Sequence, residues 1–190
     1  MRGQAAVEFI LVFPLFLFLL IAIIEFAFAF STLNALSFAA RDVARVGVEG
    51  GDRQGTDCSM LQGLEGTFGA TSDRSGIAQV EIFWSDDAGN VLHGARNVYL
   101  RGGSLSCTTV KGDSVTLPYT LQAGSTYPEN QRCTVLAGCD ALTPAHPGVD
   151  TLGVRITYDY RWKTPLAGLL QMAPALTFQA DQQMRIEPVL

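Results

Sequence analysis

The feature that most constrains this chain is an apolar segment near its N-terminus, residues 9–30. It reads FILVFPLFLFLLIAIIEFAFAF, in which Glu25 is the only charged residue. A bilayer core about 30 Å thick needs roughly 20 helical residues, so this segment is long enough to span a membrane. Arg2 is the only basic residue before it. Because basic residues tend to stay on the cytoplasmic side, we expect the N-terminus inside the cell and everything after Phe30 outside.

Outside this segment the composition is that of an ordinary globular domain. Charged residues make up 16% of the chain, below the roughly 25% of a soluble domain, and the apolar segment accounts for the difference. The net charge is -5 and no basic stripe is present, which argues against a nucleic-acid partner. The length of 190 residues fits one globular domain with an appendage.

Three interpretations of the apolar segment are open. A secretory signal peptide cleaved after Ala29 fits the small-x-small pattern of residues 27–29 and would release a soluble binding domain, but the segment is longer than a usual h-region and contains Pro14 and Glu25. A plain single-span anchor explains its length and orientation. A prepilin-type leader, whose removal leaves the apolar helix intact, also gives Glu8 a purpose. A carboxylate at the edge of an apolar helix is costly and usually marks a specific partner.

The residues from Gly3 to Pro14 carry a resemblance to a known family. A glycine, a four-residue spacer, Glu8-Phe9, the apolar run and Pro14 are similar to the start of TadE-like pseudopilins from tight adherence (Flp-type) pilus systems. The resemblance implies that a prepilin peptidase cleaves after Gly3, which makes Gln4 the new N-terminus. It also implies that Glu8 pairs with the amino group of Gln4 on a neighbouring subunit. Such pairing offsets part of the cost of desolvating both charges in lipid.

Two further segments resemble the same family, residues 39–45 at the end of its conserved helix and residues 158–187 at the end of its chains. By this resemblance the protein is a minor pseudopilin that initiates, caps or modulates a pilus. It would be a single-pass protein of the bacterial inner membrane, and the resemblance leaves open whether it stays there or is incorporated in the fibre. The implied partners are the major Flp-type pilin, other minor pseudopilins, the prepilin peptidase, the inner-membrane pilus platform and the lipid bilayer.

We predict an α+β fold in which a long N-terminal helix, membrane-spanning in its first half, packs on an antiparallel sheet as in pseudopilins. Residues 1–3 are the leader, 4–30 the transmembrane helix, 31–49 an amphipathic extension and 50–190 the extracytoplasmic domain. Pro14 predicts a kink or local break. Glu25 is expected to reach the membrane interface through a bent helix or by snorkelling. Gly47, Gly50 and Gly51 supply the stop signal.

The rest of the chain is expected to form strands and short helices. Strand patterns cover residues 80–84, 97–101, 114–121, 152–162 and 176–186. The clearest is 152–162, where apolar and polar residues alternate and predict a sheet with one apolar face. Thr56-Asp57 is expected to cap a short helix that ends near Glu65. Thr164-Pro165 is expected to begin another that ends near Met172.

Four cysteines lie on the predicted outer side, where oxidation is permitted: Cys58, Cys107, Cys133 and Cys139. Four cysteines allow three pairings. Cys133 and Cys139 enclose a short loop and are expected to pair, which leaves Cys58 with Cys107. A structural zinc site is the alternative, but there is no C-x-x-C spacing, and His93 and His146 are not clustered with the cysteines. We expect no metal and no cofactor.

Signals for catalysis are weak. Gly112-Asp113-Ser114 is similar to the start of a serine-hydrolase block, but no G-x-S-x-G occurs and such residues more often form a turn. A secreted hydrolase using Ser114 would also need a nearby acid and a histidine such as His146. Asp86-Asp87 could contribute to a calcium site, although the EF-hand spacing is missing and a solvated turn is favoured. We therefore predict that the protein is not an enzyme.

Overall fold

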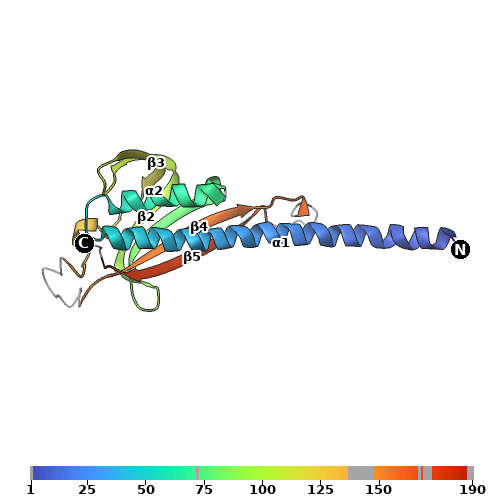
Figure 1. Ribbon diagram of the computed structural model, residues 1–190, viewed down its shortest axis with the longest axis horizontal. Coiled ribbons are helices and arrows are strands. Elements are labelled where there is room, and N and C mark those ends of the chain that lie inside the picture. Colours follow the sequence, from blue (N-terminus) through green and yellow to red (C-terminus); the bar gives the residue numbers. More distant parts are fainter. Residues whose placement is uncertain (1, 72, 137–147, 167, 169–172, 188–190) are drawn as a thin grey trace.

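The computed structural model describes residues 2–71, 73–136, 148–166, 168 and 173–187 (Figure 1). The helices are α1 (Arg2–Gly50), α2 (Thr56–Thr71) and the short 3-10 helices η1 (Arg74–Gly76) and η2 (Glu129–Gln131). The strands are β1 (Ile77–Ser85), β2 (Val91–Thr108), β3 (Ser114–Leu121), β4 (Thr151–Arg161) and β5 (Ala175–Arg185). The predicted α+β fold, a long N-terminal helix packed on an antiparallel sheet, is confirmed.

Helix α1 is continuous over 49 residues and extends far beyond the globular part of the molecule (Figure 1). It runs through Pro14, so the predicted break is wrong, and Figure 1 shows no sharp bend along α1. A proline removes only one intrahelical hydrogen bond. In a helix of this length, the bonds on both sides keep the axis continuous.

The five strands form one antiparallel sheet in the order β3-β2-β1-β4-β5. The predicted strand at 114–121 coincides with β3, and those at 80–84, 152–162 and 176–186 match β1, β4 and β5 to within a few residues. The strand predicted at 97–101 is only the middle of β2, which spans 18 residues. Strand β2 shifts register between Arg101 and Leu105, and Gly102 there has a φ of 107°. Residues 102–104 are Gly-Gly-Ser, so the apolar side chains from which a strand is predicted are missing there, although burial still alternates along β2.

The two helices cover one face of the sheet, with α1 on β4 and β5 and α2 on β2 and β3. The buried side of the outer half of α1 consists of small and aliphatic residues, while Arg41 and Arg45 on its other side are exposed, as the amphipathic pattern predicts. The helix residues of the core are Leu36, Ala39, Ala40, Val43 and Ala44 from α1 and Met60, Leu61, Leu64 and Phe68 from α2.

Two details differ from the sequence-based expectation. Helix α2 continues to Thr71 instead of ending near Glu65, because burial of Leu64 and Phe68 outweighs the low helix propensity of its glycines. Gly47 is not simply part of a stop signal, because a Cβ atom there would lie 2.4 Å from Leu152 Cδ2. It allows α1 to approach the sheet closely, and the helix ends three residues later at Gly50. The short helix predicted at 164–172 lies partly outside the described residues.

Candidate functional site

The N-terminal half of α1 projects from the domain with its apolar side chains exposed. Every side chain from residue 7 to residue 20 is exposed, including Phe9 at 64% and Leu11 at 73%. The helix contains an 18-residue window with a mean hydropathy of 3.0 and none of that window is buried. Such a continuous apolar surface is not stable in water, so lipid or other helices must cover it. This supports single-pass membrane anchoring through α1.

The residues predicted for processing and assembly all lie at the end of α1 farthest from the globular domain (Figure 1). Gly3 and Gln4 belong to its first turns, and Glu8 and Pro14 follow with exposed side chains. The Phe9 ring lies 5.3 Å from the ring of Phe13, one turn further on. The structure therefore places these residues together in the first turns of α1, and their roles stay predictions.

Glu25 has surroundings that its position in the apolar segment does not predict. Its side chain is buried, with 1% exposure, against the far end of β4. One carboxylate oxygen accepts hydrogen bonds from the Tyr160 hydroxyl at 2.5 Å and from the Lys163 backbone N–H at 3.0 Å. The other oxygen accepts from the Thr164 N–H at 2.7 Å. We call this arrangement the Glu25 clasp.

The expectation that Glu25 snorkels to the interface is therefore wrong. A carboxylate next to apolar surroundings is costly unless donors surround it. Here the globular domain supplies three hydrogen-bond donors, so the carboxylate is solvated by the protein and not by water. The clasp ties β4 to α1 a few residues beyond the stretch of residues 7–20 in which every side chain is exposed. The Tyr160 ring is also held in place, stacked on Phe178 with centroids 5.4 Å apart.

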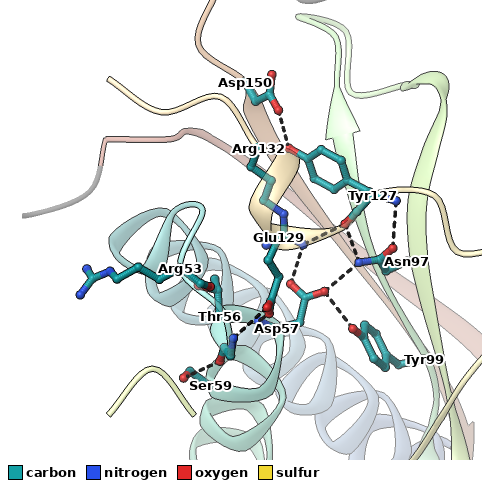
Figure 2. Close-up of polar contacts among 11 residues, drawn as sticks. Arg53, Thr56, Asp57, Ser59, Asn97, Tyr99, Tyr127, Glu129, Arg132 and Asp150 are labelled. Atoms are coloured by element: carbon teal, nitrogen blue, oxygen red, sulfur yellow. Dashed lines mark hydrogen bonds and ion pairs between the residues drawn. The ribbon is translucent and has the colours of Figure 1, made fainter. Parts of the chain in front are cut away.

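A second group of polar side chains lies inside the domain, at the N-terminal end of α2 (Figure 2). We call it the polar cluster, and it comprises Asp57, Asn97, Tyr99, Tyr127, Glu129, Arg132 and Asp150. The Asp57 carboxylate is its centre. It accepts from Arg132 Nη2 at 2.6 Å and from the Tyr99 hydroxyl and Asn97 Nδ2, both at 2.8 Å.

Glu129 completes the polar cluster by capping α2. Its two oxygens accept from the backbone N–H groups of Gly55 at 2.7 Å and Asp57 at 2.6 Å. The prediction that Thr56-Asp57 caps this helix is therefore wrong. The Thr56 hydroxyl donates to the Arg53 carbonyl, and the first backbone N–H groups of α2 are capped by Glu129 instead. A carboxylate suits a helix N-terminus because of the helix dipole. Burial raises the pKa of Glu129, and the nearby charge of Asp57 raises it further.

The remaining contacts of the polar cluster join the segment around η2 to the sheet. The Tyr127 hydroxyl donates to Asp150 at 3.0 Å, and its backbone N–H and carbonyl both bond to the side chain of Asn97. The Arg132 guanidinium lies 4.7 Å from the centre of the Tyr127 ring. The carboxylates are thus already engaged in ion pairs and hydrogen bonds, and the cluster holds no histidine or thiol. This arrangement joins α2, β2 and the segment around η2 into one network and stabilises the fold.

A hollow of about 860 Å³ adjoins the polar cluster. Its walls come from the start of α2, from β2, from the end of β3 and from the segment around η2, and include Leu105, Leu121 and Pro128. The predicted disulfide between Cys58 and Cys107 borders it and is confirmed. It joins α2 to β2 across 49 residues of sequence.

Of the other two cysteines, only Cys133 lies among the described residues. Cys133 is disulfide-bonded, and its predicted partner Cys139 lies outside the described residues. The zinc alternative is wrong for Cys58 and Cys107, because the sulfurs of a disulfide are not thiolate ligands. Among the described residues no group of three or more His, Cys, Asp or Glu side chains could hold a metal ion.

The two turns considered for chemistry are ordinary connections. Asp86 accepts from the N–H groups of Ala88 and Asn90 at 2.9 and 2.7 Å, as expected for a solvated turn between β1 and β2. Ser114 begins β3 after a turn in which the Thr109 N–H donates to the Asp113 carbonyl. His146, the histidine considered with Ser114, lies outside the described residues.

These features define a class of protein: an α+β domain carried on one long helix whose bare half can span a membrane. Residues 3–45 match the family model described as TadE-like protein, which confirms the resemblance seen around Gly3 and Glu8. The match covers most of α1 and none of the sheet, so the resemblance of residues 158–187 stays an expectation. No curated protein and no solved structure matches the chain.

Proposed function

We propose that this protein is a minor pseudopilin of a tight adherence (Flp-type) pilus system, a structural component without enzymatic activity. One observation carries the proposal. The segment that matches the TadE-like family is also the helix whose first half is bare, apolar and separate from the globular domain. A helix of this kind can associate laterally with the helices of other pilin subunits and pack among them in a fibre, while its globular domain stays folded.

The proposed mechanism has three steps. The chain inserts with its N-terminus in the cytoplasm, with residues 4–30 across the inner membrane. The prepilin peptidase then removes residues 1–3 by cleaving after Gly3, which leaves a charged amino group on Gln4. Finally the bare helix associates with pilin helices, where Glu8 pairs with the amino group of a neighbouring subunit. Pairing the two charges offsets the cost of removing each from water.

In this proposal the globular domain stands outside the membrane at the base or end of the fibre. It initiates, caps or modulates assembly together with the major pilin, other minor pseudopilins and the inner-membrane platform. The disulfide between Cys58 and Cys107 fits an oxidising compartment outside the cytoplasm.

The Glu25 clasp supports retention of the helix over release of a secreted domain. Cleavage after Ala29 would remove Glu25 and leave the Tyr160 hydroxyl and two backbone N–H groups without their acceptor. Each buried donor left unsatisfied costs about 1–3 kcal/mol. A domain designed for release would not depend on a residue of its own signal peptide.

The experiment that tests the proposal is N-terminal sequencing of the mature protein purified from its native host. The proposal predicts a mature chain that begins at Gln4. A chain that begins at Phe30 would identify a secreted domain, and one that retains Met1 would identify a plain anchor. The variant Gly3→Leu should block processing at Gly3, whereas the matched variant Ala29→Leu should leave it unchanged.

A further inference from the structure

The segment directly after β4 lies beside α1, beyond the end of the sheet on the side of the N-terminus, as the orange ribbon in Figure 1 shows. The Glu25 clasp holds it there through Tyr160 and the backbone of Lys163 and Thr164. Leu166, further along the segment, is buried at 4% exposure. We call residues 161–166 the collar segment.

The position of the collar segment along α1 coincides with the expected edge of the bilayer. The helix is bare from residue 7 to residue 20, and Ile21 and Ala22 are the first side chains to become partly covered. Residues 7–24 span roughly 27 Å at 1.5 Å per residue, close to the hydrocarbon thickness of about 30 Å. With residues 7–24 in the hydrocarbon, Glu25 and the collar segment lie at its outer edge, and residues 25–30 of the spanning segment, with the exposed Phe26, Phe28 and Phe30, lie in the interfacial layer.

The side chains of the collar segment suit that layer. Arg161 and Lys163 are exposed, and Trp162 between them is half-buried, with its indole N–H donating to the Ala173 carbonyl at 2.8 Å. Tryptophan is enriched at membrane interfaces, and lysine and arginine there attract lipid phosphates. Asp73 lies close enough to interact with both cations, and its carboxylate already accepts from the Ser75 N–H at 2.9 Å.

We propose that the collar segment is a lipid-binding site, in which Arg161 and Lys163 contact the phosphates of anionic phospholipids and Trp162 lies at the interface. The Glu25 clasp fixes the height of the collar on the helix, so the globular domain rests on the membrane surface instead of swinging freely above it. This site depends on membrane anchoring through α1 and is independent of the role in a pilus.

The test uses the full chain with Trp84→Phe, which leaves Trp162 as the only tryptophan of the two in the sequence. The protein is reconstituted in vesicles of phosphatidylcholine, alone or mixed with phosphatidylglycerol, and resistance to alkaline extraction confirms insertion of α1. Trp162 fluorescence is then measured with lipids brominated near the headgroup or deep in the acyl chains. We expect quenching by the shallow bromines and not by the deep ones, and a blue shift that grows with the phosphatidylglycerol content.

The double variant Arg161→Gln/Lys163→Gln should raise the phosphatidylglycerol fraction needed for half of the shift by about fivefold for each cation removed. The matched double variant Lys111→Gln/Arg185→Gln, which neutralises two exposed cations elsewhere, should leave it unchanged. The proposal would be overturned if the protein inserts but Trp162 is not quenched by bromine at either depth. It would also be overturned if the blue shift does not depend on phosphatidylglycerol, or does not depend on Arg161 and Lys163. A Trp162 signal that responds only to added pilin or to a second copy would also overturn it and would identify a protein partner instead.

Should Trp84→Phe disturb the fold, seen as loss of the Cys58–Cys107 disulfide, the difference between the wild-type and Trp162→Phe spectra gives the same readout. The pilus role is judged separately, from the mature N-terminus. Either result can therefore fail without the other.

Discussion

Two carboxylates of α1, Glu25 and Glu8, lie in contrasting surroundings. Glu25 is buried against the globular domain and accepts three hydrogen bonds from it. Glu8, 17 residues earlier, is exposed in the bare section of the helix. The same residue type in one helix thus serves the internal fold at one position, while the family resemblance assigns it to subunit assembly at the other. A substitution at Glu25 should therefore damage the domain, and one at Glu8 should leave the domain intact.

The largest loss of stability is expected for a carboxylate in the interior of the globular domain, Asp57. The variant Asp57→Ala leaves the Arg132 guanidinium, whose side chain has 0% exposure, buried without its ion pair. Losing one partner of such a pair typically costs about 3–5 kcal/mol. We expect that loss in the free energy of unfolding, measured by denaturant titration of the full chain in detergent. The more exposed pair between Arg155 and Asp181, 2.9 Å apart, is the control, and Asp181→Ala should cost less than about 1 kcal/mol.

The Glu25 clasp should rank next. The variant Glu25→Ala leaves the Tyr160 hydroxyl and two N–H groups without an acceptor, and we expect a loss of about 2–4 kcal/mol in the free energy of unfolding. Glu25→Gln keeps an acceptor oxygen and should lose less. The matched variant Glu8→Ala should change unfolding by less than about 0.5 kcal/mol. Equal losses at Glu8 and Glu25 would remove the distinction between the two halves of the helix.

Substitutions that enlarge a side chain should also destabilise the domain in the packed half of α1 and not in the bare half. In the packed half, a Cβ atom at Gly47 would meet Leu152 Cδ2 at 2.4 Å and Met60 Sδ at 2.7 Å, so Gly47→Ala should cost about 1–3 kcal/mol through overpacking. In the bare half, Leu11→Phe adds more volume to an exposed side chain and should leave domain unfolding unchanged. A destabilised Leu11→Phe domain would mean that the two halves do not behave independently.

The smallest expected effect is the contribution of Glu129 to the pH dependence of the free energy of unfolding. Its pKa is raised in the folded state, mainly by burial, so its protonated form favours folding and its ionisation opposes folding. Stability from this group is therefore present at low pH and lost as the pH rises through the raised pKa. Glu129→Gln does not titrate, so the free energy of unfolding of the variant minus that of the wild type should increase from pH 4 to pH 7. A difference that falls over this range would contradict the assigned direction.

Much of the fold follows from local patterns in the sequence. The apolar run predicts the bare helix, and alternation predicts β3 and β4 because their side chains face one apolar and one wetter side. The full length of β2 is not predicted, since residues 102–104 at its register shift are Gly-Gly-Ser and offer no apolar side chain to the pattern. The length of α2 is decided by packing of Phe68 and its neighbours, which no local pattern contains.

The sites were harder to predict than the strands for a physical reason. Two of the three donors to Glu25 are backbone N–H groups, which every residue except proline offers, so no residue type marks them. Asp57 and Arg132 are 75 residues apart, and charged residues are mostly exposed. Nothing in the sequence distinguishes this buried pair from surface charges. The glycine and acid near the N-terminus are different, because a prepilin peptidase would recognise a linear motif.

The most direct test of the central claim is the variant Glu8→Ala in the native host, with co-purification of the major pilin and fibre production as readouts. The matched variant Glu49→Ala changes an acid in the packed half of the same helix and serves as the control. We predict that Glu8→Ala is still processed at Gly3 and still folded, but no longer co-purifies with pilin or supports fibres, whereas Glu49→Ala behaves as wild type. Undiminished co-purification and fibre production by Glu8→Ala would contradict the proposed role of the bare helix.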